Sequence, residues 1–172
     1  YDFSMGLSTS FTGEDSLDVA IDAGSTQGAL ADLDLNTTTN DALTVDGITY
    51  TFPVGDKITV LVGDSTSGSA LYSTACVYGG FTNTLDDCGN FNSAFVATGH
   101  DDSNGFSAAY DIGNGFVGAV GYQGQGTSAA GLGTAGSTDY YGAQLTYTAD
   151  SFGASVTCLL YTSDAADERL CV

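Results

Sequence analysis

The sequence predicts an all-β fold, an antiparallel up-and-down β-barrel that is present here as a partial barrel, meaning an open or curled sheet. Bulky and small side chains alternate with a period of two over several segments, which is typical of strands with two unlike faces. The 172 residues include 24 glycines and one proline, and no long helical pattern interrupts the alternation. Short turns also alternate with long loops, as they do in up-and-down barrels.

The N-terminal segment predicts a hairpin. Residues 2–11 and 16–23 form its two strands, and residues 12–15 form the turn between them. In the second strand one face is aliphatic, whereas the other face carries Asp18 and Asp22. Side chains that alternate in this way point to opposite sides of a sheet.

A second hairpin follows after a loop. Residues 42–52 predict a strand whose apolar positions slip by one at Asp46 and Gly47, as they do at a β-bulge. A tight turn at residues 52–56 contains Pro and Gly, which supply the backbone constraints of turns. Residues 57–63 return with their aliphatic side chains on one face.

The central hairpin, residues 106–122, is the clearest element of the sequence. Residues 113–115, Gly-Asn-Gly, tolerate the positive φ that hairpin turns require. The bulky face ends in aromatic residues, as expected where a barrel meets the two membrane interfaces, while the other face carries Asp111. The candidates for lipid-facing aromatic residues, here and in the next hairpin, are Phe106, Tyr110, Phe116, Tyr122, Tyr141 and Tyr147.

Longer connections separate these hairpins. Residues 64–100 lack a clean period, and a loop of this length inside a compact domain tends to be functional. Residues 124–138 are rich in Gly, Ser, Thr and Ala and predict an exposed loop. Residues 139–149 alternate again, and residues 152–156 begin their partner strand. The last two hairpins therefore share one plan of strand, short turn, strand and long loop.

The charge of the chain excludes one class of function. The sequence has 21 acidic and two basic residues, for a formal net charge of −19. So few basic residues cannot neutralise phosphates, and we expect no nucleic-acid partner. Strongly acidic chains are often disordered. The 42% hydrophobic and 11% aromatic content and the periodic apolar positions favour a folded sheet instead.

The sequence offers little for catalysis or for metal binding. Cys76 and Cys88 lie in a polar stretch without a neighbouring histidine, so a loop-closing disulfide is favoured over a metal site. Such a disulfide implies an oxidising compartment, such as the periplasm or the cell surface. His100 is the sole histidine, and no spaced ligand motif accompanies the aspartates beside it. We expect no cofactor, no metal site and no enzymatic activity.

Several segments resemble the cyanobacterial outer-membrane porins, the group of iron-uptake or OprB-like porins. The segments are LSTSFTGEDSLDVAIDAGS (7–25), YTFPVGDKITV (50–60), VYGGFTNTLDDCGNFNSAF (77–95), YDIGNGFVGAVGY (110–122) and DYYGAQLTYTADSFGASVT (139–157). The FPVGDK turn and the TSFTG-D-L pattern are the most specific parts. The resemblance implies a barrel of about 16 strands in the bacterial outer membrane, usually a homotrimer. Small hydrophilic solutes and ions would diffuse passively through its water-filled channel, and outer-membrane lipid would surround it.

The acidic residues bear on selectivity. Asp18, Asp22 and Asp111 are candidates for the lumen, because they alternate with the apolar face. Rings of carboxylates favour cations electrostatically, so we expect a cation-preferring pore. In the porins that the chain resembles, the polar face of the second strand is often basic, so the two aspartates there argue against an anion preference.

A soluble or cell-surface β-sandwich, acting as a glycan-binding or adhesin module, is the alternative. Periodicity alone is compatible with both folds. The bulky faces of a sandwich pack on each other, whereas those of a porin remain an exposed apolar band. A sandwich ends within a strand or two of residue 157, while a porin needs further strands until an even number closes the barrel.

The C-terminal residues break the pattern. Residues 158–172, CLLYTSDAADERLCV, resemble the translated read-through of a sequencing adapter. We therefore divide the chain into an internal fragment of a porin barrel, residues 1–157, and a non-native tail, residues 158–172. Cys158 and Cys171 then carry no argument for a disulfide.

Resequencing of the source DNA across codon 157, from a library prepared without that adapter, tests this division. We expect the reading frame to continue into alternating, aromatic-ended strands. A frame that ends at Val172 would contradict the porin interpretation and favour the β-sandwich, because the barrel could not close.

Overall fold

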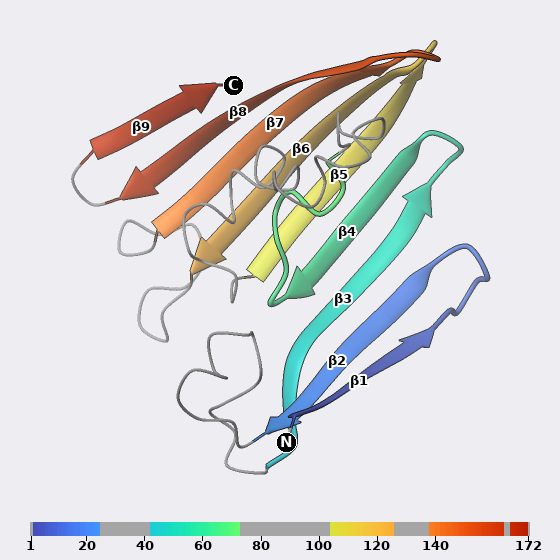
Figure 1. Ribbon diagram of the computed structural model, residues 1–172, viewed down its shortest axis with the longest axis vertical. Coiled ribbons are helices and arrows are strands. Elements are labelled where there is room, and N and C mark those ends of the chain that lie inside the picture. The colour runs from blue at the N-terminus through green and yellow to red at the C-terminus, as the bar shows by residue number, and fades with distance from the viewer. Residues whose placement is uncertain (1, 25–41, 73–103, 126–137, 164–165, 172) are drawn as a thin grey trace.

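Nine strands occur in the described residues, and they pair in the order in which they follow along the chain, each antiparallel to the last (Figure 1). The computed structural model describes residues 2–24, 42–72, 104–125, 138–163 and 166–171. The strands are β1 (Asp2–Thr9), β2 (Ser16–Gly24), β3 (Thr44–Val54), β4 (Ile58–Asp64), β5 (Asn104–Gly113), β6 (Phe116–Gln125), β7 (Thr138–Thr148), β8 (Gly153–Ser163) and β9 (Ala166–Cys171). This architecture confirms the predicted all-β, up-and-down sheet. In the order of pairing β1 and β9 are the edge strands, and the sheet is open.

The predicted β-bulge is confirmed in β3. Ala20 of β2 pairs with Gly47, whereas the next residue, Ile21, pairs with Val45. Asp46 is therefore the extra residue of the bulge. Because one additional residue shifts the side-chain alternation by one, the apolar positions on both sides of the bulge remain on the same face.

The turn of the central hairpin is also confirmed. Gly113, Asn114 and Gly115 have φ angles of 95°, 56° and 85°, a conformation that glycine and asparagine tolerate far better than other residues. The register of β5 and β6 places Phe106 opposite Tyr122. The two strands thus align their aromatic residues on one face.

The predicted position of the turn after β3 is wrong by about two residues. β3 continues to Val54, with Pro53 opposite Thr59 in the ladder, and the turn occupies residues 55–57. Pro53 lacks an N–H group, but near the end of a strand this costs the ladder little. Gly55, with a φ of 67°, supplies the left-handed conformation at which the chain reverses.

The sheet has an apolar face and a polar face that are inverted relative to a water-soluble fold. The largest of its fully buried side chains are polar: Gln123, Thr146 and Ser107 are 1%, 1% and 0% exposed. Many large apolar side chains of the strands lie exposed on the opposite face. They are Phe3, Met5, Leu7, Val45, Ile48, Val54, Val62, Phe106, Tyr110, Phe116, Val120, Tyr141, Leu145 and Val156. No helix among the described residues is long and apolar enough to cross a membrane.

The residues that we set aside as a tail continue the sheet, because β8 extends to Ser163 and β9 follows it. Cys158, for which the sequence analysis gave no argument for a disulfide, is disulfide-bonded. It lies opposite Cys171 in the β8–β9 ladder, and residues paired in this way have Cα atoms about 4.5–5.5 Å apart. β8 also runs through position 157 without a break. The proposed boundary between barrel and tail stays a prediction.

Asp15 holds the first turn together and links it to β3. Its carboxylate accepts hydrogen bonds from the Thr12 hydroxyl and amide (2.5 and 2.7 Å), the Ser10 hydroxyl (2.8 Å) and the Tyr50 hydroxyl (2.8 Å). These bonds, above all the one from the Thr12 side chain, hold the pKa of the Asp15 carboxyl well below its ordinary range, although burial opposes them. Asp15 thereby fixes the register of the first three strands at their turn end.

Replacing Asp15 by Asn is expected to lower the melting temperature at neutral pH, because the turn loses a charged acceptor. The folded-state pKa lies below the ordinary value of 3.8. The carboxylate therefore stabilises the fold above that pH, and its contribution is lost as the pH falls toward the lower value. Thermal melts of wild type and Asp15→Asn should differ most near neutral pH and converge below about pH 4.

The matched control is Glu14→Gln, which changes the exposed neighbouring carboxylate in the same turn. We expect this variant to have the melting temperature of wild type both near neutral pH and below about pH 4. A gap between wild type and Asp15→Asn that stays constant with pH would contradict the role assigned to the Asp15 charge.

Candidate functional site

The polar face of β5 to β8 carries a group of buried, uncharged side chains with hydrogen-bonding atoms. Gln144 Nε2 donates to Thr157 Oγ1 at 3.1 Å, and Thr146 Oγ1 donates to Gln144 Oε1 at 3.0 Å. Ser107 of β5 and Gln123 of β6 belong to the same face. Since every one of these groups is neutral, this part of the face offers hydrogen bonds but no charge.

A short segment folds over this group of side chains. Residues 65–72, which follow β4 and are here called the strap, cross the polar face of β5 and β6. The Gly68 amide donates to Gln123 Oε1 at 3.1 Å, and the Leu71 amide donates to Ser107 Oγ at 3.3 Å. Figure 1 shows the strap in green where it leaves β4 and turns toward β5. The strap is thus bound to the sheet through its backbone.

The end of the strap packs into the only apolar cluster that the described residues form on this face. Tyr72 contacts a cluster made by Ala119 of β6, Tyr140 of β7 and Leu159 of β8. Burial raises the pKa of the Tyr72 phenol above its usual range, so this side chain is uncharged at neutral pH. The strap therefore spans from β4 to the middle of the C-terminal strands.

Two glycines make room for the strap. A Cβ atom at Gly121 would overlap the carbonyl oxygen of Gly68, and one at Gly105 would lie 2.6 Å from the carbonyl oxygen of Thr66. Any larger residue at either position would push the strap away from the sheet. Ser65, where the strap begins, has a φ of 51°, a conformation uncommon for residues other than glycine.

The three candidate lumen aspartates all lie on the polar side, but in two different settings. Asp18 and Asp22 lie on one face of β2 and are both half-buried. Asp18 accepts a hydrogen bond from the Ser16 hydroxyl at 2.7 Å, whereas Asp22 Oδ1 is buried and has no hydrogen-bond partner among the described residues. Asp111 Oδ1 accepts the Gly113 amide at 2.8 Å and so shapes the β5–β6 turn.

The six candidate aromatic residues all lie on the apolar face, and five of them form two rows. Phe116 and Tyr147 pair near the short turns, with ring centroids 4.6 Å apart. Tyr122 and Tyr141 pair near the long connections, at 5.2 Å. Phe106 lies opposite Tyr122 and joins the second row. Tyr110, which lies opposite Gly118, is between the two rows together with aliphatic and small side chains.

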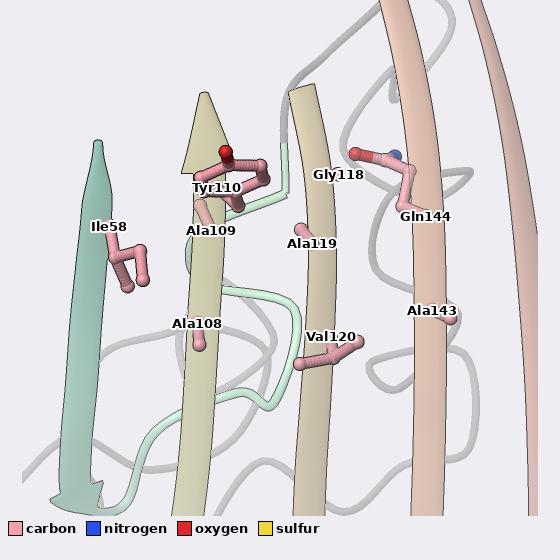
Figure 2. Close-up of a pocket in the computed structure, with 9 residues that line it drawn as sticks. All are labelled: Ile58, Ala108, Ala109, Tyr110, Gly118, Ala119, Val120, Ala143 and Gln144. Atoms are coloured by element: carbon pink, nitrogen blue, oxygen red, sulfur yellow. The ribbon is translucent and has the colours of Figure 1, made fainter. Parts of the chain in front are cut away.

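A shallow apolar depression lies between the rows, in the region of β4 to β7 (Figure 2). It has a volume of about 410 Å³ and is lined by Ile58, Ala108, Ala109, Tyr110, Gly118, Ala119, Val120, Ala143 and Gln144. It arises because small residues, such as Ala108, Gly118 and Ala143, stand among larger ones. The lining contains no carboxylate, histidine or cysteine, so the depression offers apolar surface and no acid–base chemistry.

Other candidates from the sequence cannot be placed. Cys76, Cys88 and His100 lie outside the described residues. Within the described residues, no group of three or more His, Cys, Asp or Glu side chains is arranged to hold a metal ion. Sequence reasoning also missed Asp139, which accepts a hydrogen bond of 2.6 Å from the Tyr122 hydroxyl. The pairing of β6 with β7 could have revealed this contact, since it brings the start of β7 beside Tyr122.

Comparison of the chain with models of protein families, with curated proteins and with solved structures finds no match in any of the three.

Proposed function

We propose that this chain forms part of the wall of an outer-membrane porin, a water-filled channel for passive diffusion of small hydrophilic solutes and ions. The observation that carries the proposal is the inverted sheet, whose large apolar side chains are exposed on one face while polar side chains are buried on the other. The porin resemblance of the sequence points to the same function.

Exposed apolar area on this scale is costly in water. Removing apolar surface from water contributes about 25 cal/mol of stabilising free energy per Å², and surface that stays exposed loses this contribution. The largest apolar patches of soluble monomers measure roughly 300–600 Å². Here the apolar side chains run from β1 to β8 without a covering layer among the described residues. Lipid satisfies such a face at no cost, because hydrocarbon is the environment that these side chains prefer.

The lengths of β5 to β8 fit a bilayer. Transmembrane β-strands need about 9–11 residues, and β5, β6, β7 and β8 have 10, 10, 11 and 11. Tyr122 lies six positions after Phe116, and Tyr147 lies six positions after Tyr141, which corresponds to about 20 Å along each strand. An aromatic row at each end of an apolar band about 25 Å tall is typical of outer-membrane barrels.

The polar face would line the channel. Asp18 and Asp22 place two carboxyl groups on the polar side of β2, and Asp18 accepts a hydrogen bond from the neutral hydroxyl of Ser16. A water-filled passage beside uncompensated carboxylates attracts cations. We therefore propose a cation-preferring pore.

The working pore requires more than this open sheet. β1 and β9 are edge strands, and their unpaired backbone groups find no partners in hydrocarbon. Further strands must pair with both edges before the sheet can span a membrane. A homotrimer, which the resemblance implies, stays a prediction.

Single tryptophans test which face meets lipid, and the chain has no tryptophan of its own. Val120 lies on the apolar face of β6 and is 51% exposed, whereas Val117 lies on the opposite face. In vesicles of the protein translated from the complete reading frame, brominated lipid should quench Val120→Trp strongly and Val117→Trp weakly. Aqueous iodide should give the reverse order. Equal quenching of both variants by iodide would favour the soluble β-sandwich.

Ion selectivity tests the channel itself. In planar bilayers under a KCl gradient, the same protein should conduct, with a reversal potential of the sign that cation preference requires. The double variant Asp18→Asn/Asp22→Asn should move the reversal potential toward zero, because the wall loses two negative charges. Asp56→Asn, which removes an exposed carboxylate from the β3–β4 turn, is the control and should leave it unchanged. Anion preference in wild type would overturn the proposed selectivity, and absence of conductance would overturn the channel.

A further inference from the structure

We propose that Tyr122 of β6 and Tyr141 of β7 form a site of oxidative modification, at which a one-electron oxidant joins the two rings covalently as dityrosine. Asp139 accepts the proton that Tyr122 loses in this reaction. The oxidant belongs to the class of oxidised metal complexes, which take up an electron and no proton. The inference does not depend on the proposed porin function, because it concerns only two neighbouring strands of the sheet.

The two phenol rings lie in contact. Tyr122 and Tyr141 are directly opposite each other in the β6–β7 ladder, and their ring centroids are 5.2 Å apart with an angle of 49° between the ring planes. Aromatic pairs in contact have centroids about 4.5–7 Å apart. The ring carbons beside the two hydroxyl groups can therefore meet through rotation of the side chains, while the strand pairing stays intact.

The pairing of two tyrosines distinguishes this contact from those of the other aromatic row. There Tyr147 contacts Phe116 and Phe152. Phenylalanine lacks the hydroxyl group that makes tyrosine easy to oxidise. A radical on Tyr147 therefore meets no phenol in these two contacts, whereas a radical on Tyr122 meets one at Tyr141.

A carboxylate lies beside one of the two phenols. The Tyr122 hydroxyl donates a hydrogen bond to Asp139 Oδ1 at 2.6 Å, a length typical of a bond between a hydroxyl group and a charged oxygen. Asp139 is only 3% exposed, so the protein itself holds the proton acceptor in place. Loss of an electron makes a phenol strongly acidic, and its proton then moves along this hydrogen bond to the carboxylate.

Gly124 makes room for this hydrogen bond. It lies opposite Asp139 in the ladder, and a Cβ atom there would overlap the Tyr122 hydroxyl and lie 2.8 Å from Asp139 Oδ1. Glycine in a strand interior often marks a place where another group approaches closely. A larger residue at this position would push the hydroxyl and the carboxylate apart.

The reaction balances as two one-electron oxidations. The first equivalent of oxidant takes an electron from Tyr122, whose proton passes to Asp139 and then to solvent. The second takes an electron from Tyr141, which is 43% exposed and releases its proton to water. The two radicals form a carbon–carbon bond between the ring carbons beside their oxygens, and the hydrogen on each of these carbons moves to the neighbouring oxygen. The product has two hydrogen atoms fewer than the two tyrosines.

Photo-oxidation with ruthenium tris-bipyridine and persulfate tests the proposal, in folded protein translated from the complete reading frame. Light and persulfate convert the complex to its ruthenium(III) form, which is the oxidant. We expect monomeric protein to gain dityrosine fluorescence. Cleavage before aspartates separates residues 111–138, whose one tyrosine is Tyr122, from residues 139–149. Mass spectrometry should find these two peptides joined, with the loss of two hydrogen atoms.

Two phenylalanine variants locate the cross-link. Tyr141→Phe should abolish the joined peptides. Tyr147→Phe is the matched control, because it removes a tyrosine of the same peptide that contacts phenylalanines, and it should give the wild-type yield. Joined peptides that persist in Tyr141→Phe, or that occur only in covalent dimers, overturn the site.

Asp139→Asn tests the proton acceptor, because an amide oxygen accepts the hydrogen bond but does not take up the proton. The initial rate of dityrosine formation should fall about tenfold or more. Asp150→Asn, which removes an exposed carboxylate between β7 and β8, is the control and should keep the wild-type rate. Gly124→Ala provides a second route, because it separates the two groups but retains both, and it should also slow the reaction. A wild-type rate in either variant, with circular dichroism showing that it is folded, overturns the role of Asp139.

Discussion

The alternation of side chains between two faces is the constraint on which the rest of this structure depends. A slip of one residue in any strand would move its whole apolar set to the other side of the sheet. β3 shows how strictly the sequence observes this. Without the extra residue Asp46, the positions after the bulge, including Tyr50, would point to the polar face. The bulge compensates for the slip, and the apolar face continues unbroken from β2 to β4.

The short turns preserve this register at one end of the sheet. The Asp15 carboxylate accepts hydrogen bonds from Thr12 in the first turn and from the Tyr50 hydroxyl of β3. Residues 113–115 reverse the chain between β5 and β6. The connections after β2, β4 and β6 all emerge at the opposite end. The strap begins at that end, which explains how a segment following β4 can lie across the polar sides of β5 and β6.

Local pattern was sufficient to predict β1 to β7, the start of β8, the bulge and the central turn, because each depends on residues adjacent in sequence. β9 was not predicted, because it lies in the segment set aside as a tail. Local pattern failed where contacts join distant parts of the chain. Gly68 and Gln123 are separated by 55 positions, and Asp15 and Tyr50 by 35, and no periodicity encodes which of them meet. The same limit applies to the turn after β3: Pro53 suggested a turn, but pairing with β4 keeps it in the strand. The six aromatic candidates could be assigned to one face from the sequence for the opposite reason, because the alternation of a strand alone decides which side of the sheet a side chain lies on.

The small residues of the polar face have two different physical roles, which their sequence pattern does not distinguish. Gly6 of β1 has open space before it, whereas Gly105 and Gly121 have the strap against them. In the first case a small residue leaves the face open, and in the second it permits another backbone to approach. The carboxylates of β2 also lie apart from the strap, which crosses β5 and β6.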